Sequence, residues 1–168
     1  MTAIKVAPSS LATPTKHGLF MQSEIDFRQL VNAVGDAVIA ADASGTIIFW
    51  NPAATRLFGY AQDEAIGQSL DLITPQRFQK RHWDGYHKTM QTGQTKYGHD
   101  VLKVPAVHKD GHTLSIAFTV ALLHSSDEKV SSIVAVIRDE TDRFAEERNL
   151  RKRLTEFETQ FPENSIPS

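Results

Sequence analysis

Cysteine is absent from this sequence of 168 residues. Disulfide bonds, thiolate metal sites and covalent thiol chemistry are therefore excluded. Long hydrophobic runs are absent too. No stretch approaches the roughly 18 apolar residues that a membrane span needs, and the N-terminus lacks the apolar segment of a signal peptide. We therefore expect a cytoplasmic protein that is not attached to a membrane.

An excess of charge of either sign is also missing. The sequence has 18 Lys and Arg residues against 20 Asp and Glu residues, a net charge of -2. This balance provides no general electrostatic footprint for nucleic acid. The sequence also contains no Gly-rich phosphate loop, no Gly-x-Ser-x-Gly elbow, and no kinase or cyclase signature. We therefore expect a protein that binds no nucleic acid and is not an enzyme.

The composition that is present is that of an ordinary soluble protein, with 40% hydrophobic and 23% charged residues. A chain of this length holds one domain whose core is large enough to fold without covalent staples. Residues 1–22 mix proline, serine and threonine with scattered apolar residues, which predicts a flexible tail. We expect the domain over residues 23–143, a C-terminal helix over 144–161 and a polar tail over 162–168.

A hairpin followed by a short helix is the clearest local pattern. Strand-favouring runs at 37–42 and 46–50 flank an Ala-Ser-Gly turn. Asn51 is a good N-cap, Pro52 suits the first helical turn, and Gly59 is placed to end the helix. This stretch predicts strand, turn, strand and helix.

Apolar residues at helical spacing predict a further helix over 24–34, which Ser23 is placed to cap and Gly35 to end. The elements after the hairpin follow from proline, glycine and alternating apolar residues. They are a helical turn over 62–67, a helix over 75–91, strands over 98–107, 113–123 and 129–138, and turns at 109–111 and 125–127. This order predicts an α+β fold.

The last predicted element is a helix over 139–161. Leu150, Leu154, Phe157 and Phe161 repeat at spacings of 4, 3 and 4, an apolar seam of the coiled-coil kind. Two interpretations are open. The seam helps the chain to form a homodimer, or the helix packs on its own domain.

Several short motifs occur in one order along the chain: Asp42-x-x-Gly45, Trp50-Asn51-x-Ala53, Phe58-Gly59-Tyr60, Glu64-x-Ile66-Gly67, Lys109-Asp110-Gly111 and Ile137-Arg138-Asp139-x-Thr141. Together they resemble a PAS domain, the small sensory module of signalling proteins. The resemblance implies a five-stranded antiparallel sheet with helices on one face, and a ligand pocket between the sheet and the long helix. It is closest to the sensor modules of bacterial kinases and diguanylate cyclases, including haem-binding oxygen sensors. Without cysteine, the covalent flavin chemistry of the LOV branch is excluded.

One histidine lies where the resemblance implies an iron ligand. His82 follows the helix-opening Pro75 by seven residues, the spacing of the proximal ligand in haem-binding PAS sensors. The resemblance therefore implies haem b held by His82. Phe78, His82, Tyr86 and Met90 also recur every four residues, which places the imidazole on an apolar helix face. A neutral imidazole on such a face suits haem iron.

The sequence departs from the haem-binding pattern at two places. Trp83 intervenes before Asp84-Gly85-Tyr86, so the register of this turn could be shifted by one residue. Val101 and Leu102 stand where some oxygen sensors have an arginine. His99 falls near the position of a sixth iron ligand in another haem-binding branch. The predicted cofactor-binding residues are His82, Tyr86, Phe78, Trp83, His99, Leu102 and Phe118, with His82 and His99 as iron ligands.

Other contents of the predicted pocket stay open: non-covalent flavin, another small ligand, or none. In the last case the chain's own side chains fill the space, namely Phe49, Phe58, Leu70, Phe78, Tyr86 and Phe118. The leading interpretation is a stand-alone sensory module. It binds a ligand or cofactor and passes a conformational change to a partner protein in trans or across a homodimer. The alternative is a ligand-free module for protein–protein interaction or dimerisation.

The remaining polar residues are interpreted conservatively. Asp110 and Asp139 are expected to be structural, and Asp139-x-Thr141 to set the hydrogen bonds where the last strand passes into the final helix. Five histidines match no zinc motif in their spacing and are expected to be solvated. They are His17, His87, His108, His112 and His124.

Overall fold

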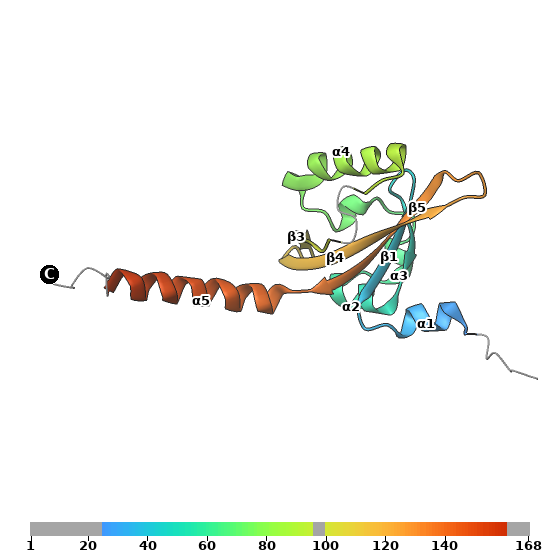
Figure 1. Cartoon of the computed structure of the whole chain (residues 1–168). Helices are drawn as coiled ribbons and strands as arrows, with labels where there is room; N and C mark the ends of the chain where they lie inside the picture. Colours follow the sequence, from blue (N-terminus) through green and yellow to red (C-terminus); the bar gives the residue numbers. More distant parts are fainter. Residues whose placement is uncertain (1–24, 96–99, 161–168) are drawn as a thin grey trace, which may run out of the picture.

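Five strand-forming runs assemble into one antiparallel sheet with the order β2-β1-β5-β4-β3 (Figure 1). The computed structural model describes residues 25–95 and 100–160. Its strands are β1 (Ala37–Asp42), β2 (Ile47–Trp50), β3 (Leu102–Val107), β4 (Thr113–His124) and β5 (Val130–Asp139). Its helices are α1 (Phe27–Ala33), α2 (Pro52–Phe58), α3 (Gln62–Ala65), the 3-10 helix η1 (Leu70–Leu72), α4 (Gln76–Thr92) and α5 (Thr141–Gln160). The predicted α+β fold with a five-stranded antiparallel sheet is confirmed.

Two predicted elements begin later than the sequence indicated. The helix expected over 24–34 starts at Phe27, because the Asp26 carboxylate caps it by accepting hydrogen bonds from the backbone N–H groups of Arg28 and Gln29. Ser23, the predicted cap, lies outside the described residues. The strand expected over 98–107 starts at Leu102, because its ladder with β4 ends at the Leu102–Phe118 pair. The other bounds agree with prediction within two residues.

The core lies between one face of the sheet and helices α2 and α3. Ile39 pairs with Trp50 on β2 and with Ala135 on β5, so these three side chains share that face. Trp50 and Phe58 are fully buried, and their ring centroids are 5.5 Å apart. Burial of such large apolar side chains is the main stabilising term of the domain.

Asn51 is a buried polar residue beside this core. Its Oδ1 accepts hydrogen bonds from the backbone N–H of Ala54, which caps α2 as predicted, and of Val38 on β1, both at 2.9 Å. Its Nδ2 donates to the carbonyl oxygens of Val31 and Asp36, both at 3.1 Å. One side-chain amide therefore ties α1, β1 and α2 together with its polar atoms paired.

A single residue separates β5 from α5. Oδ1 of Asp139 accepts hydrogen bonds from the Thr141 backbone N–H at 2.9 Å and from its hydroxyl at 2.5 Å, as the Asp-x-Thr motif predicted. The Thr141 hydroxyl oxygen accepts from the Ser115 backbone N–H on β4 at 3.0 Å. The Glu140 N–H donates to the Ser115 carbonyl at 2.8 Å. The start of α5 is therefore fixed to β4 as well as to β5.

Beyond this junction α5 projects away from the sheet (Figure 1). Every residue from 146 to 160 is exposed, including Leu150, Leu154 and Phe157 of the predicted seam. The interpretation in which this helix packs on its own domain is therefore wrong, because none of its described residues beyond Ala145 is buried or half-buried. Phe161, the last residue of the seam, lies outside the described residues. Within the described ranges, no helix is both long enough and apolar enough to cross a membrane.

Candidate functional site

The inner face of α4 carries the residues that the sequence placed there. Tyr86 is buried, and Phe78, His82 and Met90 are half-buried, whereas the intervening Arg81 is exposed. Side chains four residues apart on a helix share a face, so this pattern follows directly from the spacing. The helix ends at Gly93, whose backbone has the left-handed φ of 64°.

Two aromatic side chains fix α4 to η1 and to the turn between β1 and β2. Nε1 of Trp83 donates a hydrogen bond to Oδ1 of Asp71 at 2.9 Å, and the indole ring covers Gly45. The Tyr86 hydroxyl donates to the carbonyl oxygen of Asp42 at 2.5 Å. Burial, together with the nearby Asp42 carboxylate, raises the pKa of Tyr86 to about 12, so its phenol remains a donor at neutral pH.

His82 lies beside these two aromatic residues. Its ring centroid is 5.1 Å from that of Trp83 and 5.8 Å from that of Tyr86. Burial lowers the pKa of His82, the nearby His87 lowers it further, and the Asp71 carboxylate opposes both effects. Its Nδ1 is buried and, among the described residues, has no hydrogen-bond partner. A buried polar atom without a partner is costly, which makes this nitrogen a candidate ligand-binding atom.

The predicted site residues of the sheet lie together on adjacent strands. Leu102 of β3 is paired with Phe118 of β4, and Phe118 packs against the core. Strand alternation puts Val120 and Leu122 on the same face, and all four side chains are half-buried. The structure therefore arranges the predicted residues as an aromatic group on α4 and an apolar pair on β3 and β4. His99 lies outside the described residues.

The set of side chains expected to fill a ligand-free pocket is wrong at one position. Phe49 pairs with Ala40, whereas the next residue, Trp50, pairs with Ile39 in the core. Because neighbouring residues of a strand face opposite sides, Phe49 lies on the far face of the sheet. Phe58 is fully buried and Leu70 packs against the core, so both belong to the core proper.

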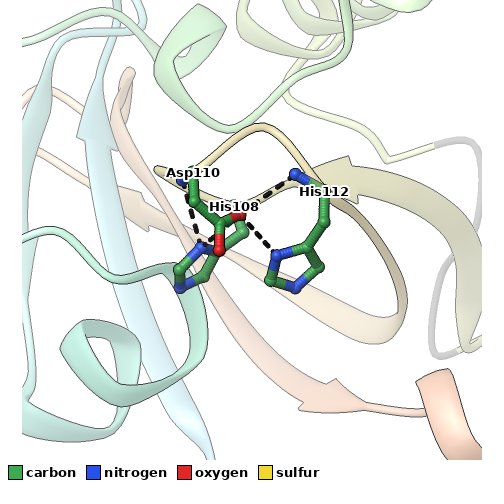
Figure 2. Close-up of side chains that lie close together, drawn as sticks. All are labelled: His108, Asp110 and His112. Carbon is green, nitrogen blue, oxygen red and sulfur yellow. Dashed lines mark hydrogen bonds and ion pairs between the residues drawn. The ribbon is translucent and has the colours of Figure 1, made fainter.

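A second group of polar side chains gathers at the turn between β3 and β4 (Figure 2). The imidazole rings of His108 and His112 are stacked with centroids 4.5 Å apart, and both approach the Asp110 carboxylate. The His108 side chain is only 22% exposed. The expectation of a solvated His108 is therefore wrong, because its ring packs over Gly59, which has no side chain to exclude it. The signal in the sequence was His-x-Asp-x-His around a glycine turn.

The other histidines and the structural aspartates agree with prediction where the structure describes them. His87 and His124 are exposed, and the ring of His87 stacks on Trp83. Asp110 accepts a hydrogen bond from the His112 backbone N–H at 3.1 Å, which shapes the turn. His17 lies outside the described residues.

Comparisons with known proteins match these features to a family. The family model described as PAS fold matches residues 25–139. The sensor protein FixL of Bradyrhizobium diazoefficiens is 27% identical over 144 residues, which is 85% of this chain and 27% of that protein. The oxygen sensor protein DosP of Escherichia coli is 25% identical over 121 residues, 72% of this chain and 15% of that protein. An uncharacterized protein of Azorhizobium caulinodans is 30% identical over 131 residues, 77% of this chain and 18% of that protein.

Solved structures agree on the fold. The PAS domain of a Colwellia psychrerythraea protein has a TM-score of 0.61 at 22% identity, and the match covers 69% of this chain and 95% of that one. An RNA-binding light-oxygen-voltage receptor has a TM-score of 0.64 at 18% identity, and the match covers 86% of this chain and 41% of that one. The chain thus spans nearly all of an isolated domain of this fold, but less than a third of each of the three curated relatives.

Proposed function

Because the chain belongs to the PAS family and is related to sensor proteins, we propose that it senses a small ligand held between α4 and the sheet. Ligand binding then changes the position of α5, which passes the signal to a partner protein or across a homodimer. The proposal contains no chemical reaction on the ligand, in keeping with a sequence that has no recognised catalytic motif.

The observation that carries this proposal is the Nδ1 of His82, which has no hydrogen-bond partner within residues 25–95 and 100–160. It lies buried on the helix face that also carries Phe78 and Tyr86. Leu102 and Phe118 supply a second apolar surface from β3 and β4. Ligand sites in proteins combine mainly apolar walls with a few polar atoms that orient the ligand. In this proposal Nδ1 of His82 is the polar atom that orients the ligand. The apolar side chains of α4 form one wall, and those of β3 and β4 form the other.

The residues at this site fit haem b. Burial lowers the pKa of His82, so its imidazole is neutral at pH 7 and has a free lone pair, as an iron ligand requires. Tyr86 and Trp83 hold α4 through their hydrogen bonds to Asp42 and Asp71 and so orient the histidine. Phe78 and Phe118 would help to exclude water from a bound haem. Haem b would supply an iron that binds a diatomic gas or changes its oxidation state. His99 as a sixth ligand stays a prediction.

The absorbance spectrum of the purified protein mixed with haem tests the proposal. We expect a shifted Soret band that His82→Ala abolishes and His87→Ala leaves in place. His87 is the matched control because it is an exposed imidazole five residues further along the same helix. An unshifted band, or one that survives His82→Ala, would refute haem at this site. Flavin absorbance in the purified protein would instead identify non-covalent flavin as the ligand.

Transmission to α5 is proposed to start at β4. Ser115 of β4 holds the first turn of α5 through Thr141 and Glu140, and Phe118 lies three residues further along the same strand. A ligand that contacts Phe118 can therefore favour one position of β4 and of the attached helix. This mechanism is a population shift, which requires that the ligand bind one arrangement more tightly than the other.

A second copy of this chain is the proposed partner of the exposed seam on α5. Leu150, Leu154 and Phe157 are 63%, 58% and 61% exposed, and their 4, 3 spacing is that of a two-stranded coiled coil. A seam of this kind is self-complementary. Phe27 of α1, 74% exposed, adds apolar surface elsewhere on the domain.

Sedimentation equilibrium tests this homodimer. We expect a dimer for the unmodified chain, a monomer for Leu154→Arg, and a dimer for Leu123→Arg. Leu123 is the matched control because it is also an exposed leucine, 50% accessible, but lies on β4 away from the seam. A monomeric unmodified chain, or a Leu154→Arg variant that remains dimeric, would refute the seam as the dimer contact.

A further inference from the structure

The turn between β3 and β4 brings two imidazoles and a carboxylate together at a place that the sensory proposal does not use (Figure 2). One ligand atom from each of His108, Asp110 and His112 lies within 4.8 Å of the other two. We propose that these three side chains bind a divalent transition-metal ion such as Zn²⁺.

The distances suit a metal centre after small adjustments. Oδ1 of Asp110 is 3.0 Å from Nδ1 of His108 and 2.5 Å from Nδ1 of His112. Ligand atoms around a tetrahedral zinc ion lie roughly 3.4 Å apart, given metal–ligand bonds of about 2.0–2.1 Å. Each of these two pairs therefore has to separate by less than about 1 Å. Rotation of the exposed His112 and Asp110 side chains, 53% and 64% accessible, provides this movement.

Nδ1 of His108 lies close to both the backbone N–H and the carboxylate of Asp110. The Asp110 backbone N–H donates to Nδ1 of His108 at 3.2 Å in the tautomer that leaves this nitrogen unprotonated. The same nitrogen lies 3.0 Å from the Asp110 carboxylate oxygen. In the other tautomer Nδ1 donates its proton to this oxygen, so in either tautomer a metal ion binds the nitrogen by displacing a hydrogen-bond partner or a proton. A metal ion beside Asp110 satisfies both atoms at once.

The backbone of the turn is already held in shape. The His108 N–H donates to the His112 carbonyl at 3.0 Å, and the Lys109 N–H donates to the Phe58 carbonyl at the end of α2 at 2.9 Å. Nε2 of His108 lies against Gly59, which turns Nδ1 toward Asp110. The backbone that carries the ligands therefore loses little conformational freedom on binding, which favours affinity.

The donor set selects the class of ion. Two imidazole nitrogens and one carboxylate oxygen suit Zn²⁺, Ni²⁺ or Cu²⁺, whereas Mg²⁺ and Ca²⁺ prefer oxygen ligands throughout. Hydrogen bonds from the His112 backbone and from the two imidazoles lower the pKa of Asp110 to about 2, so the carboxylate is ionised at neutral pH. The exposed side of the turn leaves a fourth position for water.

Calorimetric titration of the chain, without a polyhistidine tag, with Zn²⁺ tests the proposal. We expect one equivalent bound at this turn, an affinity at least about tenfold weaker in Asp110→Asn, and its loss in His112→Ala. Asp110→Asn keeps an acceptor for the His112 N–H, so it preserves the turn. His124→Ala, which removes an exposed histidine elsewhere, and His82→Ala should leave this equivalent intact.

Imidazole resonances provide a second measurement that does not depend on variants folding. Zn²⁺ should shift the signals of His108 and His112 in the unmodified chain and leave that of His124 in place. The proposal is overturned if these two signals do not move, or if the bound equivalent survives His112→Ala. Because His82→Ala is a control here, failure of this site and failure of the sensory site are distinguishable.

Discussion

Replacing Gly45 with alanine tests how α4 is held on the β1–β2 turn. Gly45 has a φ of +83°, and a methyl group there would lie 2.3 Å from the Cη2 and Cζ3 atoms of Trp83. Carbon atoms in contact are about 3.5–4.0 Å apart, so the indole ring must move by more than about 1 Å. Gly67 is the matched control, because its φ is +84° and its added methyl would meet no atom of the described residues within 4 Å.

The two variants share one cost and differ in another. Alanine in the left-handed region costs about 1–2 kcal/mol at either position. Only Gly45→Ala also overpacks the Trp83 side chain. Overpacking typically costs a further 1–3 kcal/mol, and we use the middle of this range, about 2 kcal/mol. Urea unfolding followed by circular dichroism should therefore show Gly45→Ala to be less stable than Gly67→Ala by about 2 kcal/mol.

A double-mutant cycle identifies the source of this difference. In a Trp83→Ala background the indole is absent, so Gly45→Ala should cost no more than Gly67→Ala does. The reasoning is refuted if the two glycine variants differ by less than about 0.5 kcal/mol in the unmodified background, or if the excess cost persists without Trp83. Because Trp83 contacts His82, the same variant should also weaken ligand binding at the sensory site.

Three further predictions concern single side chains. Asn51→Ala should lower the free energy of unfolding by about 3 kcal/mol, since it removes the α2 cap and leaves the buried Val38 N–H without its acceptor. Asp26→Ala, which removes an exposed cap, should cost only about 1 kcal/mol in the same urea titration; equal costs would contradict the role assigned to Asn51. Tyr86→Phe should cost about 1 kcal/mol through loss of its hydrogen bond to Asp42, and an unchanged unfolding midpoint would contradict that bond. The free energy of unfolding should fall as the pH drops below about 6.5, because the unfolded chain protonates His82 before the folded chain does. His82→Gln should remove this part of the fall, so identical pH profiles would count against the burial of His82.

Local signals were enough to predict most of the elements. Asn51 caps α2, and Gly59 and Gly93 end α2 and α4 in the left-handed conformation, because caps and glycine turns act within a few residues. The face of α4 that carries Tyr86 also followed from spacing alone. The errors at the start of α1 and β3 have a different cause. Several residues in each stretch are compatible with the element, and a cap or a strand partner decides where it begins.

The sequence by itself determined the order of strands and helices, the apolar face of α4 and the family, because each rests on short-range periodicity or on motifs in a fixed order. Tertiary structure decided which of these residues meet. The contact between Trp83 and Gly45 and the packing of His108 over Gly59 both join segments distant in sequence. The surrounding elements also bury Nδ1 of His82, for which the described part of the chain offers no hydrogen-bond partner. Tertiary structure also determined that α5 projects away from the sheet with its apolar seam exposed. Burial and close contact depend on neighbours that only the folded chain brings together, so no local pattern of residues specifies them.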